Sequence, residues 1–186
     1  MGLPSRTLWA NGNICKDSQG NYYIGNPTDV GCYDYWADII GYRKEEGHDF
    51  NVEDYVTTPG AQVTTSLAFN DAEHDIAVAR IGGGWRLPTK AEMQELANSE
   101  YCSWEWTTID GTNGYLITSI INGNTMFLPA SGYRAAGHVY YFNSYCTYWG
   151  SSLANKNEAN LYFFSSSSHG VTYKGRAIGG TFRAVI

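Results

Sequence analysis

The feature that most constrains the fold is a short stretch from Gly84 to Glu92, with the sequence G-W-R-L-P-T-K-A-E. Thr89 and Glu92 form a capping box, in which each side chain hydrogen-bonds to the backbone N–H of the other residue. Pro88 stops any helix that arrives from the N-terminal side, so we expect a helix to begin at Lys90. Apolar residues then recur at helical spacing and predict the buried side of this helix: Met93, Leu96 and Ala97.

The composition favours short strands joined by ordered loops. The chain of 186 residues has 21 glycines, 15 tyrosines and 6 tryptophans, and only 16% of its residues are charged. This length can bury a sizeable core, and we predict a single domain over residues 1–186. A net charge of -6 argues against nucleic acid or an anionic membrane as a partner, because phosphate binding needs a basic surface. No apolar run is long enough to be inserted in a membrane, and residues 1–6 contain no signal-peptide core.

The four cysteines, Cys15, Cys32, Cys102 and Cys146, include no C-x-x-C pair, which argues against zinc. Their even number leaves disulfides open, with three ways to pair all four. We favour buried free thiols, because a chain of this size folds without covalent cross-links.

The first half of the chain contains short segments and one long loop. Residues 7–10 predict a first strand, and aromatic segments follow at residues 21–24 and 33–39. Residues 41–62 are polar and predict a surface loop, which Phe50 and Tyr55 can fix to the core.

A second helix and a series of strands complete the predicted fold. The helix is expected to begin at Asn70 and to end at Gly82. Turn signals at residues 110–114 and 122–124 separate three expected strands: one around Trp104 and Trp106, one over residues 115–121, and one over residues 125–130. With a last strand at residues 181–186, two helices and a run of antiparallel strands predict an α+β domain.

Several motifs occur in an order typical of one family. The stretch W-R-L-P-T-x-x-E at residues 85–92 resembles a motif of bacterial C-type-lectin-fold domains. Further blocks match in the same order: L-W-A-x-x-N at residues 8–13, F-L-P-A-S-G-Y at 127–133, Y-W with S-S at 148–152, Arg176, and F-R-A-V at 182–185. The resemblance covers essentially the whole chain.

This resemblance implies a C-type lectin fold with two helices, short antiparallel strands and long loops. It also implies paired N- and C-terminal strands and a variable surface built by the C-terminal third. Some relatives are the variable proteins of diversity-generating retroelements, in which adenine-containing codons are randomised. These proteins bind receptors from phage tails or from cell surfaces, so we expect an exterior location and a protein or glycan ligand. A more distant cousin is the formylglycine-generating enzyme.

The residues themselves favour a binding surface in residues 132–180. This segment is rich in Tyr, Ser, Asn and Gly, and such residues combine stiff aromatic contact area with adaptable hydrogen bonds. The alternative is a loop region whose tyrosines are buried. The predicted ligand-binding residues are Tyr140, Tyr141, Asn143, Tyr145, Thr147, Leu161, Phe163, Ser165, Ser168, His169, Tyr173, Lys174 and Ile178.

The residues of segment 160–165 do not show by themselves which face of the strand points to the core, because four consecutive residues are apolar or aromatic. The family pattern places Tyr162 and Phe164 in the core. Strand alternation then turns Leu161, Phe163 and Ser165 outward, where they would form an apolar patch.

Codon chemistry limits which positions could be diversified. An AAC codon changed only at its adenines can encode Tyr, Phe, Ser, His, Leu or Ile, but neither Lys nor Glu. Tyr145, Phe163, Ser168, Tyr173 and Ile178 are compatible with this chemistry. The lysines and the acid of the same segment must be fixed or arise from other codons: Lys156, Glu158 and Lys174.

The sequence gives less support to a catalytic or a metal-dependent function. Cys146 has no second cysteine nearby to complete a formylglycine-type site, so we expect no enzyme activity. The acidic cluster around His74 (Asp71, Glu73 and Asp75) could bind a cation, but acidic residues at a helix start usually complement the helix dipole. The E-P-N, Q-P-D and W-N-D triplets of animal C-type lectins are absent, so calcium is unsupported and we expect no cofactor. A carbohydrate-binding or adhesive surface domain and a degenerate enzyme scaffold remain the alternatives, and the oligomeric state stays open.

Overall fold

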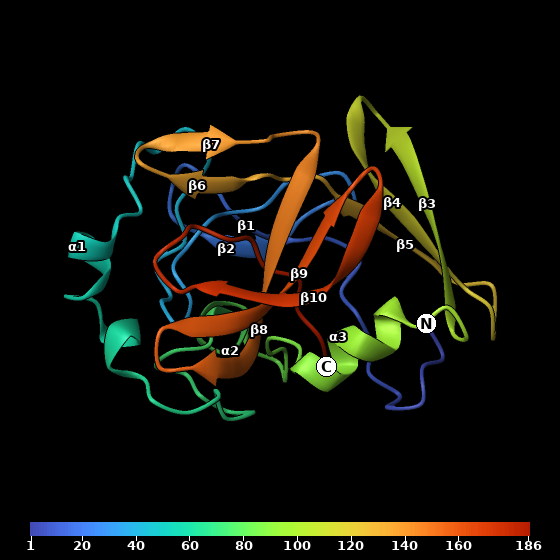
Figure 1. Cartoon of the computed structure of the whole chain (residues 1–186), viewed down its shortest axis with the longest axis horizontal. Helices are drawn as coiled ribbons and strands as arrows, with labels where there is room; N and C mark the ends of the chain where they lie inside the picture. The colour runs from blue at the N-terminus through green and yellow to red at the C-terminus, as the bar shows by residue number, and fades with distance from the viewer.

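The computed structural model describes residues 1–186 and combines small antiparallel sheets with three α-helices, an α+β arrangement (Figure 1). The helical elements are α1 (Val52–Tyr55), the 3-10 helix η1 (Pro59–Gln62), α2 (Ile76–Arg80) and α3 (Lys90–Ala97). The strands are β1 (Ile14–Lys16), β2 (Tyr22–Ile24), β3 (Cys102–Ile109), β4 (Thr112–Ser119), β5 (Thr125–Pro129), β6 (Tyr133–Ala135), β7 (His138–Tyr140), β8 (Tyr145–Asn155), β9 (Glu158–Ser165) and β10 (Ser168–Gly175). The predicted α+β class is confirmed, with α1 and η1 in addition to the two predicted helices.

Helix α3 begins at Lys90, as the capping box predicts. The Thr89 hydroxyl accepts a hydrogen bond from the Glu92 N–H at 3.3 Å, and the Glu92 carboxylate accepts one from the Thr89 N–H at 2.8 Å. The same carboxylate accepts two hydrogen bonds from Arg86, at 2.6 and 2.8 Å, and one from the Thr7 hydroxyl at 2.6 Å. Burial alone would raise the pKa of Glu92, but these donors hold it down at about 2. Glu92 is therefore an ionised link between the start of the chain and the start of α3.

Strands β3, β4 and β5 form an antiparallel sheet in chain order, which confirms the two predicted hairpins. The first turn is Asp110-Gly111, where both residues have positive φ values of 49° and 78°. The second strand ends at Ser119, two residues earlier than predicted. Ile120 and Ile121 lie instead in the turn, where their side chains are exposed.

Strands β8, β9 and β10 form a second three-stranded sheet from the Ser- and Tyr-rich part of the chain. In this sheet Tyr145 pairs with Ser165, and Ser165 pairs with Ser168. Close to this end of the sheet, β6 and β7 form a separate hairpin (Figure 1). The Gly132 N–H donates to the Tyr145 carbonyl at 2.6 Å and connects the hairpin with β8.

The two ends of the chain lie side by side. The backbone N–H groups of Leu8 and Ile186 each donate to the other residue's carbonyl at 2.9 Å, and Trp9 and Arg86 both bridge to Val185. The predicted strands at residues 7–10 and 181–186 therefore pair, but as isolated bridges rather than as a continuous ladder.

Helix α2 is shorter than expected, and the prediction that it begins at Asn70 is wrong. The Asp71 carboxylate accepts hydrogen bonds from the backbone N–H groups of Glu73 and His74, which holds this segment as a turn. The N-cap is Asp75, whose buried carboxylate accepts from the N–H groups of Ala77, Val78 and Leu87. Burial raises the pKa of Asp75 to about 6, and the three donors oppose this shift.

The loop at residues 41–62 contains α1 and η1 and is fixed by buried aromatic residues. Phe50 and Tyr55 are buried with Tyr33 and Tyr35, as predicted for the first two. The Tyr55 hydroxyl accepts a hydrogen bond of 2.6 Å from the Arg176 guanidinium.

Buried arginines connect the sheets through backbone carbonyls rather than carboxylates. Arg183 donates to the carbonyls of Ala10 and Phe127 at 3.0 and 2.9 Å, and to the Asn13 side chain at 2.8 Å. Arg134 similarly donates to the carbonyls of Arg43 and Glu46.

None of the helices combines the length and apolar character that a bilayer span requires.

Candidate ligand-binding site

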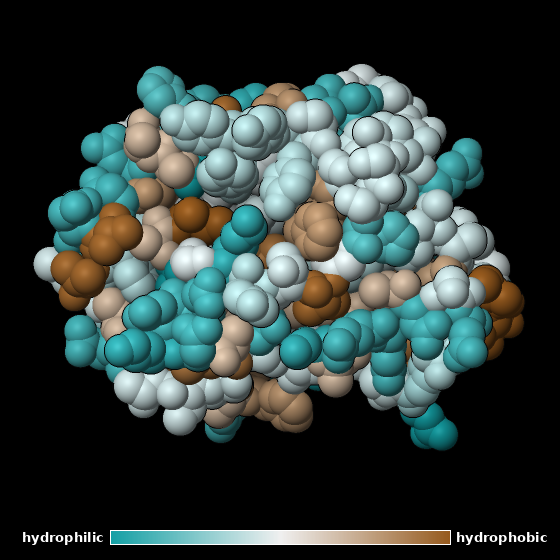
Figure 2. Space-filling model, in the orientation of Figure 1, coloured by the Kyte–Doolittle hydropathy of each residue, from teal (hydrophilic) through white to brown (hydrophobic).

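Four tyrosines gather where the β6–β7 hairpin meets the start of β8, and we call them the tyrosine cluster: Tyr133, Tyr140, Tyr141 and Tyr145. Tyr133 and Tyr140 are cross-strand partners, and their rings stack with centroids 5.6 Å apart. Tyr141 lies 6.0 Å from Tyr133 and 6.1 Å from Tyr145. Tyr141 is 63% exposed, so the cluster is a surface feature and not part of the core. Figure 2 shows side chains of intermediate hydropathy over β6, β7 and the adjoining ends of β8 to β10.

Two adjoining cavities lie beside the tyrosine cluster. The larger cavity has a volume of about 370 Å³ and is lined by Tyr133, Tyr141, Ser144, Tyr145, Ser165 and Lys174. The smaller cavity has about 170 Å³ and is lined by Tyr133, Tyr145, Thr147, Lys174 and Ile178. Because Tyr133, Tyr145 and Lys174 line both, the two cavities form one concave region. Its size is in the range of ordinary ligand pockets.

The hydroxyl groups of the tyrosine cluster differ from those of the buried tyrosines. Tyr33 and Tyr148 donate to backbone carbonyls at 2.5 and 2.9 Å. None of the four cluster hydroxyls has a hydrogen-bond partner in the chain. Burial and the neighbouring tyrosines raise the pKa of Tyr133, and burial and Cys146 raise that of Tyr145. Both hydroxyls therefore stay protonated at neutral pH and can donate to a ligand.

Residues 141–144 are held in a strained conformation by polar contacts with the β3–β4 turn. Tyr141 and Asn143 have positive φ values of 52° and 64°. The Asn143 side-chain oxygen accepts from the Asn113 N–H at 2.6 Å, and its backbone carbonyl accepts from the Asn113 side chain at 2.9 Å. Asn143, one of the predicted ligand-binding residues, is half-buried, and these contacts join residues 141–144 to Asn113.

Two of the predicted binding residues are buried. Leu161 is 0% exposed, which contradicts the prediction that it faces outward with Phe163 and Ser165. Leu161, Phe163 and Ser165 do lie on the same face of β9. Leu161, however, is part of the core cluster that includes Trp36, and this core covers its side chain. Thr147 is also buried, and its hydroxyl donates to the Gly132 carbonyl at 3.4 Å. Thr147 nevertheless lines the smaller cavity.

Phe163 and Ser165 are half-buried and lie next to the tyrosine cluster. The Phe163 ring lies 6.2 Å from that of Tyr145, and Ser165 lines the larger cavity. Tyr162 and Phe164 point to the other face and are buried, as predicted. The apolar patch is therefore smaller than expected.

The predicted residues of β10 divide between the two faces of the sheet. Ser168 lies in the same row as Ser165, and Lys174 reaches the cavities. His169 and Tyr173 alternate with these residues and belong to the opposite face. The His169 ring stacks on Trp104 at 4.1 Å and hydrogen-bonds to the Tyr162 hydroxyl at 3.0 Å. His169 therefore packs between the two sheets, whereas Tyr173 is 55% exposed away from the cluster.

Two residues that the sequence analysis does not single out for binding belong to the site. Tyr133 was included only in the motif F-L-P-A-S-G-Y, yet it lines both cavities. Ser144 lines the larger cavity. Phe142, which follows Tyr141, lines neither cavity; its ring is exposed, and the Lys44 ammonium lies 3.4 Å from the ring centre.

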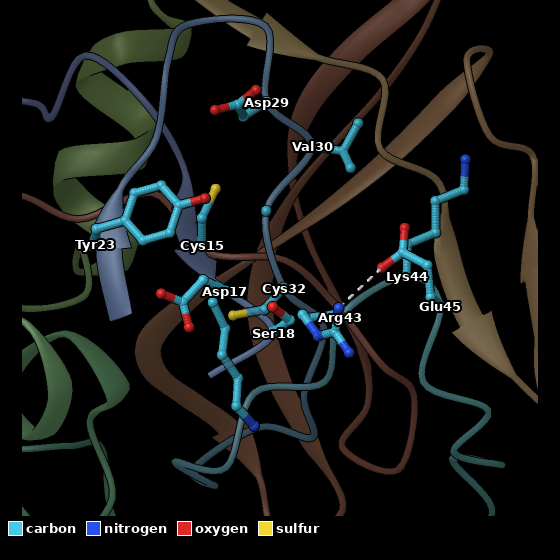
Figure 3. A pocket seen from close by; sticks show the side chains of 12 residues that line it. Cys15, Asp17, Ser18, Tyr23, Asp29, Val30, Cys32, Arg43, Lys44 and Glu45 are labelled. Carbon is cyan, nitrogen blue, oxygen red and sulfur yellow. Dashed lines mark ion pairs between the residues drawn. The ribbon is translucent and has the colours of Figure 1, made fainter. Parts of the chain in front are cut away.

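A separate surface pocket of about 370 Å³ lies near Cys15 (Figure 3). Several of its polar groups are already paired within the chain. The Asp17 carboxylate accepts hydrogen bonds from Gln19 and Asn21, and the Lys16 ammonium donates to two backbone carbonyls. Burial raises the pKa of the Cys15 thiol to about 11, so this thiol is not a nucleophile at neutral pH. The pocket is therefore a weaker candidate than the region beside the tyrosine cluster.

The residues considered for catalysis and metal binding occupy structural positions. The Cys146 thiol is buried, and burial raises its pKa well above the usual value. All four cysteines are buried free thiols. Asp71 pairs with His74 at 3.0 Å, while Asp75 caps α2. No group of three or more His, Cys, Asp or Glu side chains is arranged to hold a metal ion.

Comparison of the chain with models of known families, with curated proteins and with solved structures finds no match. The tyrosine cluster, its cavities and the sequence motifs are therefore the basis for assigning a function.

Proposed function

We propose that the protein is a non-catalytic ligand-binding domain with a C-type lectin fold, and that it binds its ligand at the tyrosine cluster. The observation that carries this proposal is the cluster itself: four neighbouring tyrosines have unpaired hydroxyls, and three of them line a concave region on the surface. Tyrosine supplies a large contact area at a small entropic cost, because it has only two rotatable side-chain bonds.

The frame around the cluster supports the proposed fold. The W-R-L-P-T-x-x-E motif begins α3 with a full capping box, and the two chain ends pair through Leu8 and Ile186. Both features are expected of bacterial C-type-lectin-fold domains. The cluster is fixed to this frame, because the Gly132 N–H and the Asn143 side chain bond to neighbouring strands.

We further propose that the domain is the variable protein of a diversity-generating retroelement. Five residues are compatible with adenine-directed codon changes, and four of them lie on or beside the concave region: Tyr145, Phe163, Ser168 and Ile178. Lys174, which this chemistry cannot produce from an AAC codon, would be a fixed residue of the same site. A receptor on a cell surface is the ligand that such a protein would recognise.

Selection of a phage-displayed random peptide library on the immobilised protein tests the binding site. Each selected peptide is measured again on the double variant Tyr141→Ser, Tyr145→Ser. We expect most peptides to lose at least tenfold in affinity, because aromatic anchors dominate such surfaces. The control is Tyr23→Ser, which removes another exposed tyrosine, from β2 and outside the cluster. Peptides that bind the double variant and the wild-type protein equally would contradict the proposed site.

The genomic neighbourhood tests diversification. A nearby repeat that is almost identical to the 3′ end of the gene and differs only at adenines, next to a reverse transcriptase gene, is the expected arrangement. A complete locus without such a repeat would remove the retroelement proposal and leave the binding site unaffected.

A further inference from the structure

The concave region beside the tyrosine cluster is lined by aromatic rings, hydroxyl groups and one lysine ammonium. Its one charged side chain is Lys174, which lines both cavities. The four ion pairs of the chain do not include Lys174. Lys16, by contrast, already donates to two backbone carbonyls, and Lys44 lies over the Phe142 ring. Lys174 is therefore the cation that the site leaves available to a ligand.

The other polar groups of the region complement this cation. Tyr133 and Tyr145 contribute protonated hydroxyls that have no partner in the chain. No carboxylate, amide or imidazole side chain lines either cavity. A lysine ammonium has three donors and no acceptor, so the group that fits best is an acceptor-only anion such as a carboxylate.

The same composition argues against a neutral sugar as the ligand. A neutral sugar carries no charge, so it would leave the Lys174 ammonium in the site without a counter-charge. Aromatic walls and a volume of about 370 Å³ suit an amino-acid side chain together with a neighbouring residue.

We propose that the site recognises an acidic side chain, Asp or Glu, on a protein ligand. The carboxylate forms a charge-assisted hydrogen bond with Lys174, and the adjacent apolar part of the ligand packs on the tyrosine cluster. This inference rests on the proposed function and specifies the class of ligand that the site takes.

The peptide selection described above also tests this inference. Among the peptides that depend on Tyr141 and Tyr145, we expect Asp and Glu to be enriched over the unselected library. Lys174→Met should weaken these peptides about tenfold to a hundredfold, the usual contribution of a charge-assisted hydrogen bond. A new selection on Lys174→Glu should enrich Lys and Arg instead. The matched control is Lys156→Glu, an exposed lysine in the β8–β9 turn that lines neither cavity.

The outcomes separate the two proposals. Peptides that depend on the tyrosines but show no acidic enrichment, or that bind Lys174→Met unchanged, overturn the acidic-ligand inference alone. The absence of both tyrosine-dependent peptides and Lys174-dependent glycan binding contradicts the binding site as well. A parallel array of sialylated and uronic-acid glycans identifies the other source of carboxylates. Lys174-dependent binding to those glycans without peptide binding would overturn the assignment of a protein ligand.

Discussion

The Arg86 guanidinium and the Glu92 carboxylate form a two-bond ion pair at the start of α3, with N–O distances of 2.6 and 2.8 Å. The same carboxylate also accepts hydrogen bonds from Thr7 and Thr89. One acidic group thus connects three segments: the start of the chain, the extended stretch before Pro88, and the helix itself.

Glu92→Gln is expected to lower the free energy of unfolding by about 2 to 4 kcal/mol, because it leaves the partly buried Arg86 without its counter-charge. Urea denaturation followed by circular dichroism measures the change. Glu100→Gln removes an exposed carboxylate just beyond the helix and should change the stability by less than about 0.5 kcal/mol. Equal effects of the two substitutions would show that the ion pair does not stabilise the fold.

Gly132→Ala should disrupt the tyrosine cluster. Gly132 has a φ of 70°, and an added Cβ would lie well inside van der Waals contact of the Tyr140 carbonyl oxygen and 3.0 Å from the Phe142 N–H. We expect a loss of at least about 3 kcal/mol in stability, or a displaced β6–β7 hairpin, measured by denaturation and by hydrogen exchange of residues 138–145.

The control for this glycine is Gly123→Ala. Gly123 has a similar φ of 73°, but an added Cβ would meet nothing within 4 Å. This change should therefore cost only the backbone strain, about 1 kcal/mol. If both substitutions cost the same amount, close packing at Gly132 does not hold the hairpin in place.

Two substitutions at Asn143 separate anchoring from backbone strain. Asn143→Ala removes the side-chain acceptor of the Asn113 N–H and places alanine at a φ of 64°, so we expect a loss of about 2 kcal/mol. Asn143→Gly removes the same acceptor but tolerates this φ, so it should cost less. Hydrogen exchange of residues 140–145 should accelerate in both variants. Unchanged exchange would contradict the anchoring role.

The buried Asp34 predicts a pH dependence of stability. Burial raises its pKa to about 7, above the value near 3.8 of an exposed Asp. Between these two values the folded state binds more protons than the unfolded state, so this contribution to stability is largest at low pH and falls as the pH rises to about 7. The free energy of unfolding of the wild-type protein should therefore fall by roughly 2 to 3 kcal/mol between pH 5 and pH 8, relative to that of Asp34→Asn, which cannot ionise at this position.

The exposed turn residue Asp110 provides the control for this measurement, because Asn tolerates its positive φ. Asp110→Asn should follow the wild-type stability at both pH values in urea titrations. A pH-independent difference between the wild-type protein and Asp34→Asn would mean that Asp34 ionises normally in the folded state.

The sequence predicted the local elements best where short-range chemistry decides the structure. The Thr89–Glu92 capping box and the Asp110-Gly111 turn are determined by neighbouring residues, and both are confirmed. The start of α2 was wrong because two signals compete within five residues. Asp71 forms a turn with its own side chain, and Asp75 is the cap that the helix uses.

The candidate site was only partly predictable, because exposure depends on distant segments. Alternation placed Leu161 and Phe163 correctly on one face of β9, but it could not show that the core around Trp36 covers Leu161 and leaves Phe163 half-exposed. The role of Asn143 depends on Asn113, 30 residues earlier in the chain, and no local pattern indicates that contact.

The hydrogen-bonded pairing of Leu8 with Ile186 has a practical consequence for orientation. Both chain ends lie in the lower part of the view in Figure 1, whereas the β6–β7 hairpin lies at the top. A tether joined to either end would leave the tyrosines facing away from the object that carries the protein. Immobilisation through a terminal tag should likewise keep this surface free for incoming molecules.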